Sequence, residues 1–242
     1  MQINLIIDRE CDYILINLSG ISKIYDNGCV ALSDITVDIP KGDFVFVVGP
    51  SGAGKSTFIK LIFREELPTQ GKLVVNGRNV GELKLSEVPY LRRNLGIIFQ
   101  DYRLLPDKTV YENVAFAMQV IEASHREIKK RVVQVLDLVG LRHKAKCCPS
   151  ELSGGEQQRV AIARAIVNNP VVVIADEPTG NLDPETSWEI MKIFTRINKG
   201  GTTIVMATHD KTVVDAMKKR VIAIENGTIA RDEVKGVYGY ED

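Results

Sequence analysis

The sequence alternates short runs of apolar, often β-branched residues with segments whose apolar positions repeat at helical spacing. Strand-like runs occupy residues 44–48, 171–175, 202–206 and 221–224. Helical spacing follows near residues 185–197 and 211–218. This alternation is typical of an α/β fold in which the sheet is largely parallel.

The first part of the chain has a different pattern. The runs YILINL (13–18) and ALSDITVDI (31–39) are punctuated by SG, DNG and KG, so they predict a mostly antiparallel β layer that leads into the strand at 44–48. Val74 and Val75, just before an Asn-Gly turn, are expected to join the same layer.

The middle of the chain changes to a helical period and predicts a helical insertion. One apolar face is marked by Val110, Val114, Met118 and Ile121. A second face is marked by Ile128, Val132, Val135, Leu136 and Val139. We expect an N-terminal extension at 1–12 and a single domain at 13–242, with the insertion at about 101–165. The ending VYGYED (237–242) reads as a polar, mobile tail.

Composition excludes several classes of function. The 31 basic and 31 acidic residues cancel, which argues against a protein that coats nucleic acid or an anionic membrane. No apolar run approaches the roughly 18 to 20 residues that cross a bilayer, and the N-terminus does not resemble a secretory signal, so we expect a cytoplasmic chain. The cysteines form no CxxC pair and predict free thiols; they are Cys11, Cys29, Cys147 and Cys148.

The stretch GPSGAGKST (49–57) fits the phosphate-loop pattern GxxxxGK[ST] between a strand and a helical segment. Its glycines let successive backbone N–H groups and the helix N-terminus point at a phosphate. Lys55 supplies positive charge for the β- and γ-oxygens, and the Ser56 hydroxyl suits Mg²⁺. The predicted ATP-binding residues of this loop are Gly49, Pro50, Ser51, Gly52, Ala53, Gly54, Lys55, Ser56 and Thr57.

The run VVVIADE (171–177) places two acids at the C-terminal end of a buried parallel strand, where open α/β sheets bind ligands. Asp176 is expected to hold Mg²⁺ through water, and Glu177 is the candidate base that deprotonates the attacking water. Kinases, GTPases and helicases also use phosphate loops, so these two motifs leave the class of enzyme open.

The segment ELSGGEQQRVAIARAIVNNP (151–170) supplies the deciding pattern. Ser153 and Glu156 have the spacing of a capping box, so a helix begins here with unobstructed N–H groups at Gly154 and Gly155, a second anion site. LSGGEQQ resembles the signature of ATP-binding cassette (ABC) ATPases. The resemblance covers essentially the whole chain and implies a P-loop NTPase fold with an ABC nucleotide-binding domain. It also implies a head-to-tail homodimer in which Ser153 to Glu156 of each chain cover the γ-phosphate of the ATP held by the other.

The resemblance assigns four further residues. Tyr25 would stack on adenine, and Gln100, at the end of LGIIFQ, would contact Mg²⁺ and water. Asp183 of GNLD would lie along the dimer interface, and His209 would bond the γ-phosphate and position Glu177. The other histidines, His125 and His143, read as surface residues.

The motif EPTGNLD (177–183) is typical of the lipoprotein-release, macrolide-export and cell-division ATPases. The stretches 88–120, 159–170 and 231–242 favour the cell-division group. That likeness implies an integral-membrane partner, a place at the cytoplasmic face of the membrane at the septum, and control of septal peptidoglycan hydrolases. The alternatives are a lipid or drug transporter ATPase and a soluble repair or translation ATPase. The last normally has coiled coils or two cassettes.

We also expect a groove beside Gln100 to dock the membrane partner, because the insertion is hydrophobic and follows the ATP-sensing glutamine. Its predicted lining is Tyr102, Leu104, Leu105, Val114 and Phe116.

Overall fold

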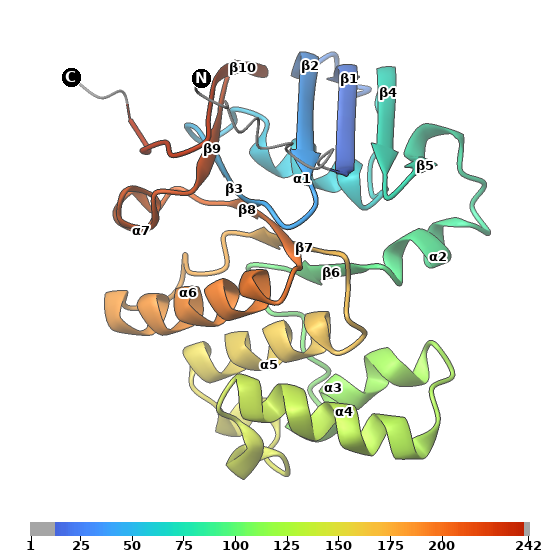
Figure 1. Ribbon diagram of the computed structural model, residues 1–242, viewed down its shortest axis with the longest axis vertical. Helices are drawn as coiled ribbons and strands as arrows, with labels where there is room; N and C mark the ends of the chain where they lie inside the picture. The colour runs from blue at the N-terminus through green and yellow to red at the C-terminus, as the bar shows by residue number, and fades with distance from the viewer. Residues whose placement is uncertain (1–12, 240–242) are drawn as a thin grey trace, which may run out of the picture.

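The computed structural model describes residues 13–239 and contains two β-sheets with helices on either side (Figure 1). The expected extension at 1–12 lies outside these residues. The smaller sheet is antiparallel, in the order β2-β1-β4-β5, as the glycine-punctuated pattern predicted. Its strands are β1 (Ile14–Ile24), β2 (Val30–Pro40), β4 (Gln70–Val75) and β5 (Arg78–Asn79).

The larger sheet has six strands in the order β10-β9-β3-β8-β7-β6. Its strands are β3 (Phe44–Val48), β6 (Leu95–Ile98), β7 (Val172–Asp176), β8 (Thr203–Ala207), β9 (Arg220–Glu225) and β10 (Thr228–Glu233). All neighbours pair in parallel except β9 and β10, which form an antiparallel hairpin. The α/β class with a largely parallel sheet is therefore confirmed.

Strand β10 was not predicted from the sequence. It is an edge strand whose residues are largely exposed, so it lacks the apolar run that marks the other strands. Only the preceding Asn226-Gly227 pair, both at positive φ, gave a hairpin signal.

Helices cover both faces of the larger sheet. They are α1 (Lys55–Ile62), α2 (Val88–Arg92), α3 (Val110–Gln119), α4 (His125–Leu138), α5 (Gly154–Ile166), α6 (Pro184–Lys199) and α7 (Lys211–Met217). Short 3₁₀ turns lie at η1 (Val80–Glu82), η2 (Arg142–Lys144) and η3 (Pro149–Glu151). Helix α1 and the antiparallel sheet lie on one side, and α3 to α6 lie on the other (Figure 1).

The larger sheet separates two hydrophobic cores. Alternate side chains of β3 enter opposite cores: Phe44, Phe46 and Val48 pack with the helices α3 to α7, and Val45 and Val47 pack with α1 and the antiparallel sheet. Because both faces are buried, the strand that leads into the phosphate loop is apolar at every position. The loop is thus anchored from two sides.

At the periphery, helix α3 is shorter than the helical pattern predicted. Helix α3 ends at Gln119, so Ile121 lies beyond the helix and is 36% exposed, unlike the rest of the predicted face. His125 and His143 are exposed, as predicted. Cys29, Cys147 and Cys148 are free thiols, and Cys11 lies outside the described residues. No helix within 13–239 combines the length and apolar character needed to cross a membrane.

The prediction of a mobile C-terminal tail is wrong for residues 237–239. The Arg231 guanidinium donates to the carbonyls of Val237 at 2.7 Å and Gly239 at 2.6 Å and holds the segment on the protein. The sequence did not predict this attachment, because it is made through backbone carbonyls, which are present at every residue.

Candidate nucleotide-binding site

The phosphate loop joins the C-terminal end of β3 to the N-terminus of α1. A Cβ atom at Gly49 would lie 2.1 Å from the Ile224 carbonyl oxygen, and one at Gly54 would lie 2.5 Å from that of Ala31. Both positions therefore require glycine, and the backbone curls as the motif predicted. The ammonium of Lys55 donates to the carbonyls of Gly49 at 2.7 Å and Pro50 at 3.0 Å, so its positive charge lies over the loop.

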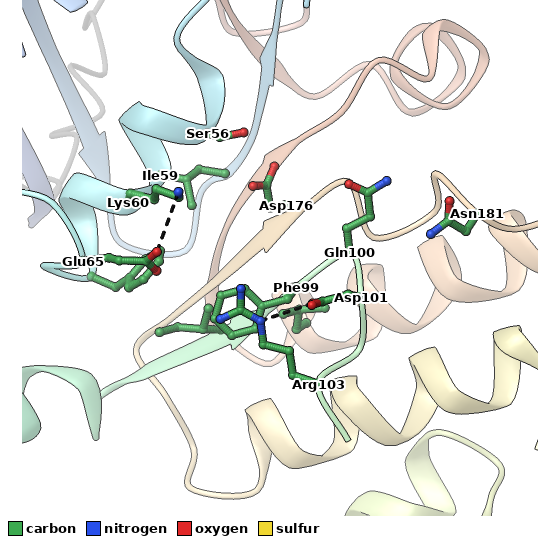
Figure 2. Close-up of a pocket in the computed structure, with 13 residues that line it drawn as sticks. Ser56, Ile59, Lys60, Glu65, Phe99, Gln100, Asp101, Arg103, Asp176 and Asn181 are labelled. Atoms are coloured by element: carbon green, nitrogen blue, oxygen red, sulfur yellow. Dashed lines mark hydrogen bonds and ion pairs between the residues drawn. The ribbon is translucent and has the colours of Figure 1, made fainter. Parts of the chain in front are cut away.

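The three predicted metal ligands face one cavity of about 390 Å³. Figure 2 shows Ser56 from α1, Asp176 from the end of β7 and Gln100 beyond β6 directed into this space. Burial raises the pKa of Asp176, and a hydrogen bond with the Ser56 hydroxyl opposes the shift. A hydroxyl, an amide oxygen and a carboxylate are hard oxygen donors, so the residues present fit Mg²⁺ shared with substrate phosphates.

The raised pKa of Asp176 leads to a testable expectation. Between the ordinary pKa of 3.8 and the higher folded value, the folded chain binds more protons than the unfolded chain, so its stability falls as pH rises. Asp176→Asn removes this cost. We expect the variant without nucleotide to melt at a higher temperature than the parent at neutral pH, with a smaller difference at acidic pH, and to lose Mg²⁺-dependent hydrolysis. An exposed carboxylate on β2 gives the control, Asp38→Asn. Lower stability of Asp176→Asn at neutral pH would contradict the assignment.

Glu177 and His209 lie in contact, as the family resemblance implied. The Glu177 carboxylate is 2.7 Å from Nδ1 of His209 and also accepts the His209 backbone N–H at 3.3 Å. Glu177 adopts a left-handed backbone with φ 49°, which is uncommon for a residue other than glycine. The Glu177 side chain is 15% exposed and that of His209 is 64% exposed. The carboxylate is therefore held by the surrounding protein, and the imidazole is accessible to solvent.

Tyr25 lies near the phosphate-loop helix, not in a core. Its hydroxyl is 3.1 Å from that of Thr57, and the Lys23 ammonium lies 4.9 Å from its ring centroid. The ring is half-exposed, so it offers a face on which a base could stack.

The signature segment forms the capping box that its spacing predicted. Ser153 and Glu156 exchange hydrogen bonds at the start of α5, and Glu156 also pairs with Lys144 at 2.6 Å. The hydrogen bonds from Lys144 and Ser153 lower the pKa of Glu156. Lys144 and Ser153 together keep the Glu156 carboxylate charged, and a negative charge is favourable at the N-terminus of a helix.

The structure does not bring the signature to the phosphate loop of the same chain. A Cβ atom at Gly154 would meet Tyr102 and Leu182, and one at Gly155 would meet Thr186. These neighbours belong to the segments after β6 and β7. The two anion-binding helix ends of one chain are therefore separate half-sites.

Asp183 has a structural role at the start of a helix. It is the N-cap of α6 and accepts the backbone N–H of Thr186 at 2.9 Å. Hydrogen bonds from Thr186 lower its pKa. The Asp-Pro pair at 183–184 was a recognisable signal for such a helix start. Its place in a dimer interface stays a prediction.

Several residues around the site were missed. Asn181 lines the cavity beside Gln100 (Figure 2), and Gln158 on α5 is fully buried and donates to the Pro178 carbonyl at 2.7 Å. Arg164, also on α5, donates to the carbonyls of Tyr102 and Arg103. Each contact joins segments distant in sequence, and a glutamine or arginine within a helix gives no local sign of it.

The predicted docking groove requires correction. Val114 is fully buried in the core and cannot line a surface, and Leu104 packs against the same core. An apolar groove of about 430 Å³ does exist where α2, β6, α3 and α5 meet. It is lined by residues that include Leu95, Ile97, Phe116, Val120 and Ile121. Of the predicted lining residues on α3, Phe116 lines this groove and Val114 does not.

Comparison with known proteins places these features in a class. The family described as ABC transporter matches residues 32–180. A solved structure described as the dimeric post-hydrolysis state of the ATP-binding cassette MJ0796, bound to ADP and Pi, superimposes with a TM-score of 0.83 at 35% identity. The match covers 93% of this chain and 100% of that one. The chain is therefore an ABC-type ATPase.

Sequence relatives show to which group within the ABC transporter family the chain belongs. The chain is 60% identical over 228 residues to the Cell division ATP-binding protein FtsE of Bacillus subtilis (strain 168), a match that covers 94% of this chain and all of the relative. It is 47% identical over 213 residues to the protein of the same name from Escherichia coli (strain K12), with 88% and 96% covered. Within the ABC transporter family, the chain belongs to the FtsE group.

Proposed function

We propose that this chain is the ATP-hydrolysing subunit of a bacterial cell-division complex of the FtsEX type and acts as an ATP-bridged homodimer. The observation that carries the dimer is the separation of its two half-sites. The signature glycines contact the segments around Tyr102, Leu182 and Thr186, and the phosphate loop lies elsewhere. The related cassette MJ0796 is described as dimeric, which supports closure between two chains.

In this proposal each site residue has a role in ATP binding or hydrolysis. The loop 49–54 and Lys55 bind the phosphates of ATP, and Tyr25 stacks on the base. Ser56, Gln100 and, through water, Asp176 would hold Mg²⁺, which would supply positive charge to neutralise the phosphate oxygens. Glu177 takes a proton from water as the water oxygen bonds to the γ-phosphorus and the bond from that phosphorus to the β–γ bridging oxygen breaks, so that ADP leaves. His209, bonded to Glu177, keeps that carboxylate in place.

Closure of the dimer supplies what one chain lacks. Ser153 is the N-cap of α5, and Gly154 and Gly155 form its first turn, where helix N–H groups stabilise negative charge. In the proposed head-to-tail pair they complete the γ-phosphate site of the sister chain. ATP binding and subunit closure are thereby one event.

The membrane partner in this proposal is FtsX, with the chain bound peripherally at the cytoplasmic face of the membrane at the division septum. ATP-driven closure would transmit a conformational signal through FtsX to septal peptidoglycan hydrolases or their adaptors. The names of the relatives support the cell-division assignment. Reconstitution of the complex in vesicles tests it. Nucleotide-dependent hydrolase activation is expected, whereas ATP-driven movement of a lipid or drug substrate would favour a transporter ATPase.

The groove beside α3 gives a second test. Phe116 is 42% and Val120 is 52% exposed, which is unusual for residues of this size next to a core. We expect Phe116→Glu and Val120→Glu to abolish co-purification with FtsX and to leave nucleotide affinity unchanged. Ile14→Glu, at an exposed position of the antiparallel sheet, is the matched control. Co-purification of both groove variants at the parent level would exclude this surface.

A further inference from the structure

The ring of Tyr25 is in contact with one member of a partly buried ion pair. The Lys23 ammonium lies over the ring, 4.9 Å from its centroid, and pairs with the Glu66 carboxylate at 2.8 Å. The Lys23 side chain is 12% exposed and that of Glu66 is 29% exposed, so the pair is largely shielded from water. An ammonium in this position occupies one face of the ring, and a base could stack only on the other face.

The segment between α1 and β4 fixes both this charge and the backbone beside Tyr25. It contains Glu66 and also Thr69, whose hydroxyl accepts the Ile24 N–H at 2.9 Å and donates to the Ile24 carbonyl at 3.3 Å. The Tyr25 hydroxyl is 3.1 Å from that of Thr57 on α1. The ring is therefore held at its hydroxyl, at its backbone and over one face, and α1 and the segment after it provide these contacts.

The physical effect of these contacts is to order the ring before nucleotide binds. A cation over an aromatic face is attracted to the negative charge of that face. Lysine alone is a mobile side chain, and the short ion pair with Glu66 restricts it to this position. A ring that is already ordered loses less conformational freedom when a base stacks on it, so affinity for the base is higher.

We propose that Lys23 and Glu66 are positioning residues for the nucleotide base, which hold the Tyr25 ring so that its open face accepts the adenine of ATP. The proposal rests on the stacking role given above to Tyr25. Neither Lys23 nor Glu66 lines the cavity faced by the predicted metal ligands. Their effect should therefore be confined to the base and should not extend to the phosphates.

The test compares the affinities of the full chain for Mg²⁺-ATP and for inorganic tripolyphosphate, which lacks the base, by titration calorimetry. Lys23→Met keeps a long apolar side chain and removes the charge. We expect it to weaken ATP binding about 3- to 10-fold and to leave tripolyphosphate binding unchanged. Glu66→Gln should weaken ATP binding about 2- to 5-fold, and the double variant should lose little more than Lys23→Met, because both residues act through one contact.

Two further variants serve as controls. Lys23→Arg keeps a cation that can lie over the ring and should bind ATP within about 2-fold of the parent. Lys72→Met removes the charge of an exposed lysine on β4 and should bind both ligands as the parent does.

Three results would overturn the proposal. The first is parent-level ATP affinity in Lys23→Met, and the second is an equal loss of affinity for ATP and tripolyphosphate, which would indicate general damage to the site. The third is a Lys23→Arg chain that binds ATP as weakly as Lys23→Met, which would exclude a role for the charge.

Tyr25→Ala, titrated in parallel, separates this proposal from the role on which it rests. If Tyr25→Ala weakens ATP binding and Lys23→Met does not, Tyr25 stacks on the base and only the supporting role of Lys23 is wrong. If Tyr25→Ala binds ATP as the parent does, the stacking role is itself wrong and the proposal fails with it.

Discussion

Glu177→Gln is expected to bind ATP and to hydrolyse it at least about 100-fold more slowly than the parent, because loss of a general base typically costs 10²- to 10⁴-fold. The amide keeps the size of the side chain and can still accept the hydrogen bond from His209, which the carboxylate accepts over 2.7 Å. The bound triphosphate therefore persists. The variant should accumulate as a closed dimer in Mg²⁺-ATP, which sedimentation velocity measures directly.

Glu82→Gln provides the matched control, since Glu82 is an exposed residue of η1 that does not line the cavity faced by Ser56, Gln100 and Asp176. It should hydrolyse ATP as the parent does and show no added dimer. A Glu177→Gln chain that remains monomeric at saturating Mg²⁺-ATP would contradict closure between two chains.

Lys55→Ala is expected to weaken ATP binding by roughly 10- to 100-fold, the effect of losing charge-assisted hydrogen bonds to phosphate oxygens. The Lys55 ammonium lies over the loop, bound to the carbonyls of Gly49 and Pro50, and alanine leaves those acceptors without it. Titration with a fluorescent ATP analogue measures the change. The variant should also fail to dimerise with ATP, unlike Glu177→Gln.

Lys72→Ala tests whether a general loss of positive charge has the same effect, because Lys72 is an exposed residue of β4. Its affinity for the analogue should equal that of the parent. Equal affinity of Lys55→Ala and the parent would remove the loop from the nucleotide site.

The sequence predicted those parts of the site that depend on local chemistry. The phosphate loop needs glycine where a Cβ atom would strike Ile224 or Ala31, and the capping box of Ser153 and Glu156 needs a spacing of three. Asp176 was placed correctly because an apolar run ends at it. Each of these features depends on residues that are close together in the sequence, so hydrophobic periodicity and motif spacing predict it.

The parts that were missed depend on contacts between distant segments. Val114 and Phe116 lie on one helix, yet the first is buried and the second exposed, and only the packing of α3 decides which faces out. Tyr238 meets Asp215 across 23 residues and Arg164 meets Tyr102 across 62. The backbone carbonyls in such contacts carry no sequence signature.

The buried amide of Gln158 ties the helix that would cap a sister chain's nucleotide to the loop after this chain's own Glu177, through Pro178. Because this link lies in the packed interior, a displacement of the start of α5 would be transmitted to the loop after Glu177. In the proposed pair, ATP bound at one site would then alter the catalytic competence of the other site. The two chains would therefore hydrolyse ATP in a coupled manner and not independently.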